Sequence, residues 1–111
     1  MQVTLEFQLT QDDLDDIVDA ACHGIGYWAD EAEYSTSLLS ISAEEGAEIH
    51  EIGKADIEKA MASIIEGEVS ISDSIRNDIS SAIRENDYGY IDSYAADAIV
   101  QIACFGEIVY G

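Results

Sequence analysis

Four stretches of the chain carry apolar residues at the spacing of an amphipathic helix, and this pattern constrains the fold more than any other feature. Residues three and four positions apart share one face of a helix, so each stretch predicts one buried stripe. The first stretch covers about residues 11–23. Its stripe consists of Leu14, Ile17, Val18 and Ala21. Thr10 is the expected N-cap, and Gly24 and Gly26 supply the stop.

Three further helices are expected in the second half of the chain. The first is expected to run from about Lys54 to Glu66. The second is expected to begin at a cap on Ser72 or Asp73, and the third at a cap on Asp92 or Ser93 and to end at Gly106. Their stripes are Ile57, Ala60, Met61, Ile64 and Ile65, then Ile75, Ile79, Ala82 and Ile83, then Ala95, Ala98, Ile99, Ile102 and Ala103. Because the chain contains no proline, glycines and polar caps must set these helix ends.

Alternating apolar and polar residues predict strands over residues 3–8, 35–42 and 47–52. The last two, joined by a turn at Glu44-Glu45-Gly46, form an expected hairpin over about 35–52. The segment 27–34 fits neither period. We therefore predict a single α+β domain over residues 1–111, with a small three-stranded antiparallel sheet packed against about four helices.

Charge sets the second constraint. The chain has 24 Asp and Glu but only 4 Lys and Arg, a formal net charge of −20, together with 48% hydrophobic residues. That apolar content is enough for a core, so we expect the acidic residues on the outside of a folded body. Such a surface argues against direct binding of nucleic acid and against docking on anionic lipid. The opening residues lack a signal-peptide pattern and no window reaches 18 apolar residues, so we expect a cytoplasmic protein.

The residues able to support catalysis or metal binding are few. Cys22 and His23 are neighbours on a helix, where their side chains diverge, so a nucleophile–base pair would need Cys104 with His23 or His50 through a tertiary contact. We expect instead core thiols and surface or capping histidines. Residues 11–16 are rich in Asp but lack the glycine of a calcium loop. The sequence therefore predicts no catalytic residues, no metal and no cofactor, and hence not an enzyme.

The predicted binding surface is acidic, with two tyrosines as anchors. Asp12, Asp15, Asp16 and Asp19 fall opposite the first apolar stripe, at about 5–6 Å along the helix axis, a spacing of the same order as that of phosphates on a nucleic-acid strand. The tyrosines are expected on an exposed turn at residues 87–90. The complete predicted set is Asp12, Asp15, Asp16, Asp19, Asp30, Glu31, Glu33, Glu44, Glu45, Glu48, Tyr88 and Tyr90.

Three explanations compete for this uncompensated charge. It can serve solubility, because acidic residues help more than basic ones. It can reflect life at high salt, where screening removes the repulsion. It can also imitate a phosphate backbone and enter the cationic cleft of a nucleic-acid-binding protein, with association speeded by complementary fields. The third explanation is favoured, because the charge is so large for so small a chain.

Two segments resemble known proteins. Residues 10–18 running into Gly24-Ile25-Gly26-Tyr27-Trp28, and residues 96–111 at the other end, resemble the two ends of small acidic proteins from bacterial genomes and their prophages, a family with no assigned activity. The resemblance covers about a third of the chain. It implies a phage or mobile-element origin, and small acidic phage proteins are often similar in role to nucleic-acid mimics.

The function expected from charge and resemblance together is inhibition of a host defence system of the anti-CRISPR or anti-restriction type. The partner would be a basic nucleic-acid-binding host protein, such as a defence nuclease or surveillance complex. The chain would act as a monomer or homodimer in the bacterial cytoplasm. The alternative is a non-enzymatic structural or regulatory interaction module of a phage, whose acidity serves solubility or salt adaptation.

Overall fold

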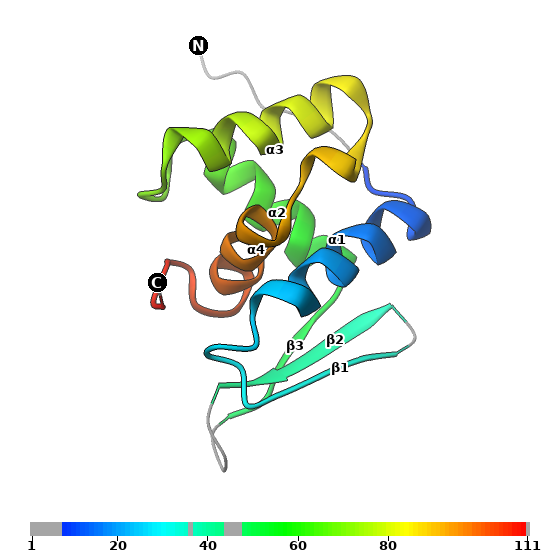
Figure 1. The fold of residues 1–111 in the computed structure, drawn as a ribbon, viewed down its shortest axis with the longest axis vertical. Helices are drawn as coiled ribbons and strands as arrows, with labels where there is room; N and C mark the ends of the chain where they lie inside the picture. Colours follow the sequence, from blue (N-terminus) through cyan, green and yellow to red (C-terminus); the bar gives the residue numbers. More distant parts are fainter. Residues whose placement is uncertain (1–7, 36, 44–47, 111) are drawn as a thin grey trace.

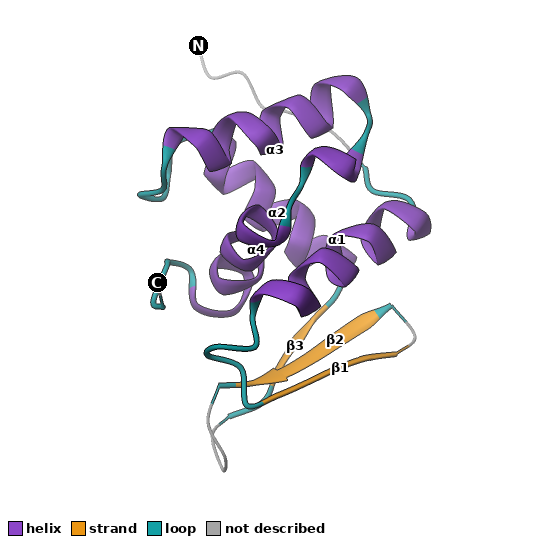
Figure 2. Ribbon diagram, viewed as in Figure 1, coloured by secondary structure: helices purple, strands orange, loops and turns teal. Residues whose placement is uncertain are grey.

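A computed structural model describes residues 8–35, 37–43 and 48–110 and has an α+β fold (Figures 1 and 2). A three-stranded antiparallel sheet lies at one end, and four helices stack on it and beyond it. In chain order the elements are α1 (Gln11–Gly24), β1 (Glu31–Ser35), β2 (Leu38–Ser42), β3 (His50–Ile52), α2 (Lys54–Ile65), α3 (Asp73–Glu85), a 3-10 turn η1 (Tyr88–Tyr90) and α4 (Ser93–Phe105). The predicted fold class is confirmed, and all four helices lie where their apolar spacing placed them.

Local hydrogen bonds explain where the helices begin. The Thr10 hydroxyl accepts the Asp13 N–H at 3.1 Å, and the Asp13 carboxylate accepts the Thr10 N–H at 2.9 Å, a complete capping box. The Ser72 hydroxyl caps α3 by accepting the Ile75 N–H, and the Asp92 carboxylate caps α4 by accepting the Ala95 N–H, so the first of the two candidates is the cap in each case. Gly106 ends α4 at φ +77°, a left-handed conformation that favours glycine.

The sheet has the order β1-β2-β3, and the hairpin predicted over 35–52 is present as the β2–β3 pair, with Leu39 opposite Ile52. The predicted strand 35–42 is wrong at its start. Ser35 ends β1, Ser37 turns the chain at φ +63°, and β2 begins only at Leu38. The predicted turn at 44–46 and most of the predicted strand 3–8 lie outside the described residues, while Gln8 is described and belongs to no strand.

The strand that the sequence did not reveal is β1. It lies in the segment 27–34 that fitted neither period, and only Tyr34 of its five residues is partly buried. Backbone pairing with β2 holds it, with Ala32 opposite Ile41. Since an exposed edge strand needs no apolar face, its sequence carries no alternation to detect.

Helix α4 occupies the centre of the helical layer, in contact with the other three helices and β3 (Figure 1). The single stripe predicted for it was incomplete, because Ala96, Val100 and Gln101 are buried as well. A helix surrounded by neighbours buries most of its circumference. Among the described residues, no helix is long and apolar enough to cross a membrane.

Candidate functional site

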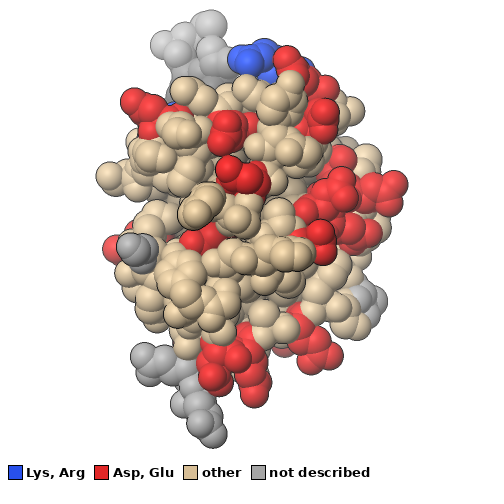
Figure 3. Space-filling model, viewed as in Figure 1, with Lys and Arg blue, Asp and Glu red and all other residues tan. Residues whose placement is uncertain are grey.

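Helix α1 presents the predicted row of carboxylates to solvent. Asp12, Asp15, Asp16 and Asp19 are all exposed, while the opposite face of α1 is buried in the core. Residues 1–53 contain 13 Asp and Glu but no Lys or Arg, so nothing on α1 or β1 compensates this charge. The largest group of acidic atoms on the face in Figure 3 lies over α1, and more acidic atoms follow at the lower edge, over β1.

A hydrogen-bonded link joins the α1 carboxylates to β1. The Tyr34 hydroxyl donates to Asp15 Oδ1 at 2.7 Å, and the Gln11 side-chain amide donates to the same oxygen at 2.7 Å. Burial, followed by the hydrogen bond to Asp15, raises the pKa of Tyr34, so its hydroxyl remains a donor. Asp15 thus has a structural role besides its charge, whereas Asp12, Asp16 and Asp19 accept no side-chain hydrogen bond among those found in the described chain.

The strand residues predicted for the same surface are also exposed. Glu31 and Glu33 alternate along β1 and therefore share one face. Asp30 precedes them and donates its backbone N–H to Ser42 at 2.8 Å. We call Asp12, Asp15, Asp16, Asp19, Asp30, Glu31 and Glu33 together the α1–β1 acidic surface. Glu48 is exposed near β3, and Glu44 and Glu45 lie outside the described residues.

Acidic residues are not confined to this surface. Exposed carboxylates also occur on or beside the other helices, at Asp56, Glu66, Glu68, Asp73, Glu85, Asp87, Asp92 and Glu107. All four Lys and Arg residues fall within 54–84, so residues 1–53 and 85–111 both lack them. What distinguishes the α1–β1 acidic surface is its density of charge, with its seven carboxylates all within residues 12–33.

One of the two predicted tyrosine anchors was misplaced. Tyr88 is only 5% exposed and belongs to the hydrophobic core, whereas Tyr90 is 45% exposed. Asp87 caps the 3-10 turn by accepting the Gly89 N–H at 3.0 Å, and this turn directs Tyr88 inward. Burial, followed by Asp13 and Glu58, raises the pKa of Tyr88. Of the two predicted anchors, Tyr90 alone is exposed to a partner.

A pocket that the sequence analysis missed lies beside α4, with a volume of about 690 Å³. We call it the α4 pocket. It is formed by the C-terminal end of α1, the α2–α3 connection, one face of α4 and the C-terminal segment. Its lining residues are His23, Gly24, Tyr27, Ser70, Ile71, Ser72, Ile75, Ser93, Tyr94, Asp97, Ala98, Gln101, Ile108 and Tyr110. Pockets of this size accommodate small organic ligands.

The α4 face of the pocket follows helical spacing. Tyr94, Asp97, Ala98 and Gln101 recur at intervals of three and four, so they project from one side of the helix. The sequence carried a signal for this face, because Asp97 and Gln101 are polar residues within an otherwise apolar helix. The predicted stripe of Ala95, Ala98, Ile99, Ile102 and Ala103 left both of them out, but Gln101 is 1% exposed.

Asp97 is the hub of a polar network on the pocket wall. It accepts hydrogen bonds from Trp28 Nε1 at 2.7 Å, from the Tyr27 hydroxyl at 2.6 Å and from the Gln101 amide at 3.0 Å. Burial first, and then the hydrogen bond to Asp97, raises the pKa of Tyr27 to about 12. The Tyr27 hydroxyl therefore stays protonated at neutral pH and orients the carboxylate.

Gln101 ties the C-terminal segment to this network. Its Oε1 accepts the backbone N–H groups of Val109 at 2.9 Å and Tyr110 at 2.8 Å, and its Nε2 donates to the Tyr110 carbonyl at 3.0 Å. The Tyr110 ring then stacks on Trp28, with 5.2 Å between centroids and 4° between planes. The wall of the pocket formed by residues 108–110 is thus fixed by one buried side chain.

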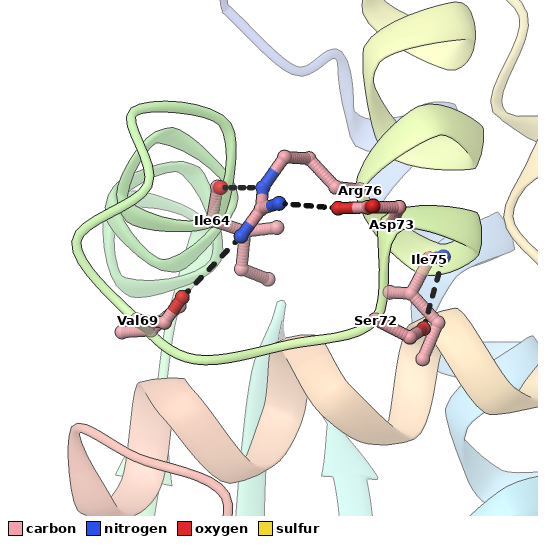
Figure 4. Close-up of polar contacts among 6 residues, drawn as sticks. All are labelled: Ile64, Val69, Ser72, Asp73, Ile75 and Arg76. Atoms are coloured by element: carbon pink, nitrogen blue, oxygen red, sulfur yellow. Dashed lines mark hydrogen bonds and ion pairs between the residues drawn. The ribbon is translucent and has the colours of Figure 1, made fainter.

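Arg76 fixes the α2–α3 connection, which contributes residues 70–72 to the pocket; Figure 4 shows the contacts of Arg76. Its guanidinium donates to the carbonyl of Ile64 at 3.0 Å, near the end of α2, and to that of Val69 at 3.5 Å, in the α2–α3 connection. It also forms an ion pair with Asp73 at 3.0 Å. Because the guanidinium bridges α2, the connection and α3, it holds residues 70–72 in place at the rim of the pocket.

The thiols and histidines do not form a nucleophile–base pair in the described structure. Burial, followed by Asp56, raises the pKa of the Cys104 thiol to about 12. Cys22 is exposed rather than in the core as predicted, and desolvation and then Asp19 raise its pKa. His23 Nδ1 donates to the Asp19 carbonyl at 2.8 Å, and His50 contacts the Phe105 ring edge-on. No group of three potential metal ligands occurs within the described ranges.

Comparison with known proteins gave no match: no family model, no curated protein and no solved structure is similar to this chain.

Proposed function

We propose that this protein is a non-enzymatic inhibitor that occupies the cationic nucleic-acid-binding cleft of another protein with its α1–β1 acidic surface. The observation that carries the proposal is the row of exposed carboxylates on α1, continued onto β1 through the Tyr34–Asp15 hydrogen bond, in a region without Lys or Arg. The raised pKa values of both thiols support a binding role over a catalytic one.

The geometry suits recognition by lysine and arginine side chains. Asp12, Asp16 and Asp19 follow one another at intervals of four and three, so they form a row with spacings of about 6 and 4.5 Å along the helix axis. Short aspartate side chains on a helix lose less conformational entropy on binding than long side chains do, and complementary potentials raise the association rate. The same row repels nucleic acid itself, so the expected partner is a protein.

The proposed target class rests on the sequence resemblance to prophage proteins alone. We propose a bacterial defence nuclease or surveillance complex, whose nucleic-acid cleft is lined by basic residues. The proposed place of action is then the bacterial cytoplasm.

The test compares two triple variants of equal charge. In the first, Asp12→Asn, Asp16→Asn and Asp19→Asn remove the α1 row while leaving Asp13 and Asp15 to their structural contacts. In the control, Glu66→Gln, Glu68→Gln and Glu107→Gln remove three exposed charges elsewhere. Each protein is immobilised and incubated with bacterial lysate, and bound nucleic-acid-binding proteins are eluted with salt or with duplex DNA. The eluted proteins are then assayed for nuclease activity with and without the inhibitor.

The proposal expects a nuclease or surveillance protein that DNA displaces, that the wild-type chain inhibits, and that the α1 variant but not the control fails to bind. Binding should weaken strongly as ionic strength rises, because screening acts on exposed charges. Equal binding by both variants, or capture that neither DNA nor salt reverses, would refute mimicry.

The second candidate is an interaction module whose acidity serves solubility or high salt. It draws on the exposed carboxylates found on or beside every helix and on a single ion pair, Arg76–Asp73, among the described residues. This candidate expects the free energy of unfolding to be low in dilute buffer and to rise markedly in molar KCl, with both triple variants gaining stability to the same extent.

A further inference from the structure

The α4 pocket has a distinct chemical character. Two exposed tyrosines line it, Tyr27 at 61% exposed and Tyr94 at 76% exposed. Ile71, Ile75 and Ile108 supply apolar walls. Among the described residues that line it there is one carboxylate, Asp97, and no Lys or Arg.

We propose that the α4 pocket binds an organic cation, that is, an ammonium or guanidinium group attached to an apolar body. The charged group would lie at Asp97 between the two tyrosine rings, and the apolar body would lie against Ile71 and Ile75. This inference is independent of the α1–β1 acidic surface.

The state of Asp97 favours a cationic ligand. Its Oδ1 accepts two hydrogen bonds, from Trp28 and Gln101, while its Oδ2 accepts only one, from Tyr27. A carboxylate has about four acceptor positions, so Oδ2 retains one for a ligand N–H. The three donors hold the carboxylate in a fixed orientation, which reduces the entropy lost on binding.

The tyrosine rings and the negative net charge of the protein also favour a cationic ligand. Tyrosine rings attract cations at their faces, and Tyr94 precedes Asp97 by three residues, so both project from the same side of α4. The net charge of −20 attracts cations and repels nucleotides, fatty acids and other anions. The ligand class is therefore set by charge as well as by shape.

A row along α1 leads from the acidic surface to the pocket. Asp12, Asp16 and Asp19 share a helix face with His23, which lines the pocket. The cation could accordingly come from either of two sources: a free amine or guanidine, or an arginine side chain of a polypeptide that lies along α1. The chemistry recognised in the pocket is the same for both.

The test uses probes of similar size that differ in charge: 2-phenylethylamine, 2-phenylethanol and 3-phenylpropanoate. Binding is measured by two-dimensional amide NMR, which locates the site, and by the fluorescence of Trp28, the sole tryptophan, which contacts Asp97. The dipeptide amide acetyl-Arg-Phe-NH2 represents the polypeptide source. The proposal expects saturable shifts around Tyr94, Asp97 and Gln101 with the amine, at a dissociation constant of about 1 mM or below. The anion should give none.

Three variants separate the site from general attraction. Asp97→Asn keeps an acceptor for Trp28 but removes the charge, and it should weaken amine binding by about tenfold or more. Ser70→Trp changes an exposed residue that lines the pocket and should block entry without disturbing the core; because it adds a second tryptophan, its binding is followed by NMR alone. Glu107→Gln removes one exposed charge away from the pocket lining and should leave amine binding within about twofold of wild type.

The outcomes are decisive in both directions. Tighter binding of the amine identifies a free small molecule as the source, and tighter binding of the dipeptide identifies a polypeptide; each supports the site. Equal affinity for amine, alcohol and acid would overturn the proposal, as would binding that persists in Ser70→Trp, or no saturable amine binding by the folded wild-type protein. These results do not depend on whether the α1 row captures a nuclease.

Discussion

Replacing Gln101 with methionine tests how strongly a single side chain holds the C-terminal segment. Methionine is unbranched and of similar length, so Gln101→Met keeps the volume of the buried site while it removes every hydrogen bond of the amide. In the native structure the amide joins Asp97 and Tyr27 to the backbone of Val109 and Tyr110.

The expected loss in the free energy of unfolding follows from these contacts. Each hydrogen bond contributes about 0.5–1.5 kcal/mol net, and five contacts involve the amide, although its two N–H groups are shared among three acceptors. Residues 109 and 110 are not fully buried, so water can solvate their freed N–H groups once the segment detaches. We therefore expect Gln101→Met to lower the free energy of unfolding by about 3 kcal/mol. For a chain of this size that corresponds to a melting temperature about 12 °C lower.

The assay combines global and local measurements. Urea unfolding gives the free energy, and amide hydrogen exchange at Val109 and Tyr110 shows whether the segment detaches. Fluorescence of Trp28 should shift to longer wavelength, because Tyr110 no longer covers it. Val109→Ala, at a side chain that is 53% exposed, is the control and should change stability by less than about 0.5 kcal/mol. A loss below about 1 kcal/mol for Gln101→Met, with unchanged exchange at both amides, would refute the reasoning.

Further changes test other features of the fold. Gly24→Ala should destabilise by about 1–3 kcal/mol, because a Cβ would lie 2.5 Å from the Ser93 carbonyl oxygen, whereas Gly26→Ala meets nothing within 4 Å and should be close to neutral in the same urea titration. Thr10→Ala should cost about 1 kcal/mol by removing the cap of α1; an unchanged urea midpoint would argue against the capping box. The Cys104 thiol has its pKa raised from 9.0 to about 12, so the folded state keeps its proton while the unfolded state ionises. The contribution of Cys104 to the free energy of unfolding is therefore fully present below pH 9 and is lost as the pH rises towards 12. Cys104→Ala should flatten the pH dependence of the unfolding free energy over this range, as measured by urea unfolding.

The helices illustrate what could be predicted from the sequence. α1, α3 and α4 combine an apolar stripe at intervals of three and four with a polar N-cap within a few consecutive residues, whereas α2 begins after Gly53 with no side-chain cap. Thr10 and Gly106 occupy the helix ends predicted for them, while the N-caps of α3 and α4 were each predicted only as one of two adjacent residues. The exposure of the α1 carboxylates followed from the same periodicity, since the face opposite a buried stripe must meet water.

Tertiary structure alone decided the rest. β1 forms because its backbone pairs with that of β2. The 3-10 turn places Tyr88 in the core, and the α4 pocket brings together residues of α1, α4 and the C-terminal segment. Trp28 and Asp97 meet across 69 positions of sequence. The helical period of a sequence indicates which side of a segment is buried, but not which distant groups contact that side. Asp97 and Gln101 could therefore be recognised from the sequence as polar residues in an apolar helix, whereas their hydrogen-bond partners are set by the tertiary structure.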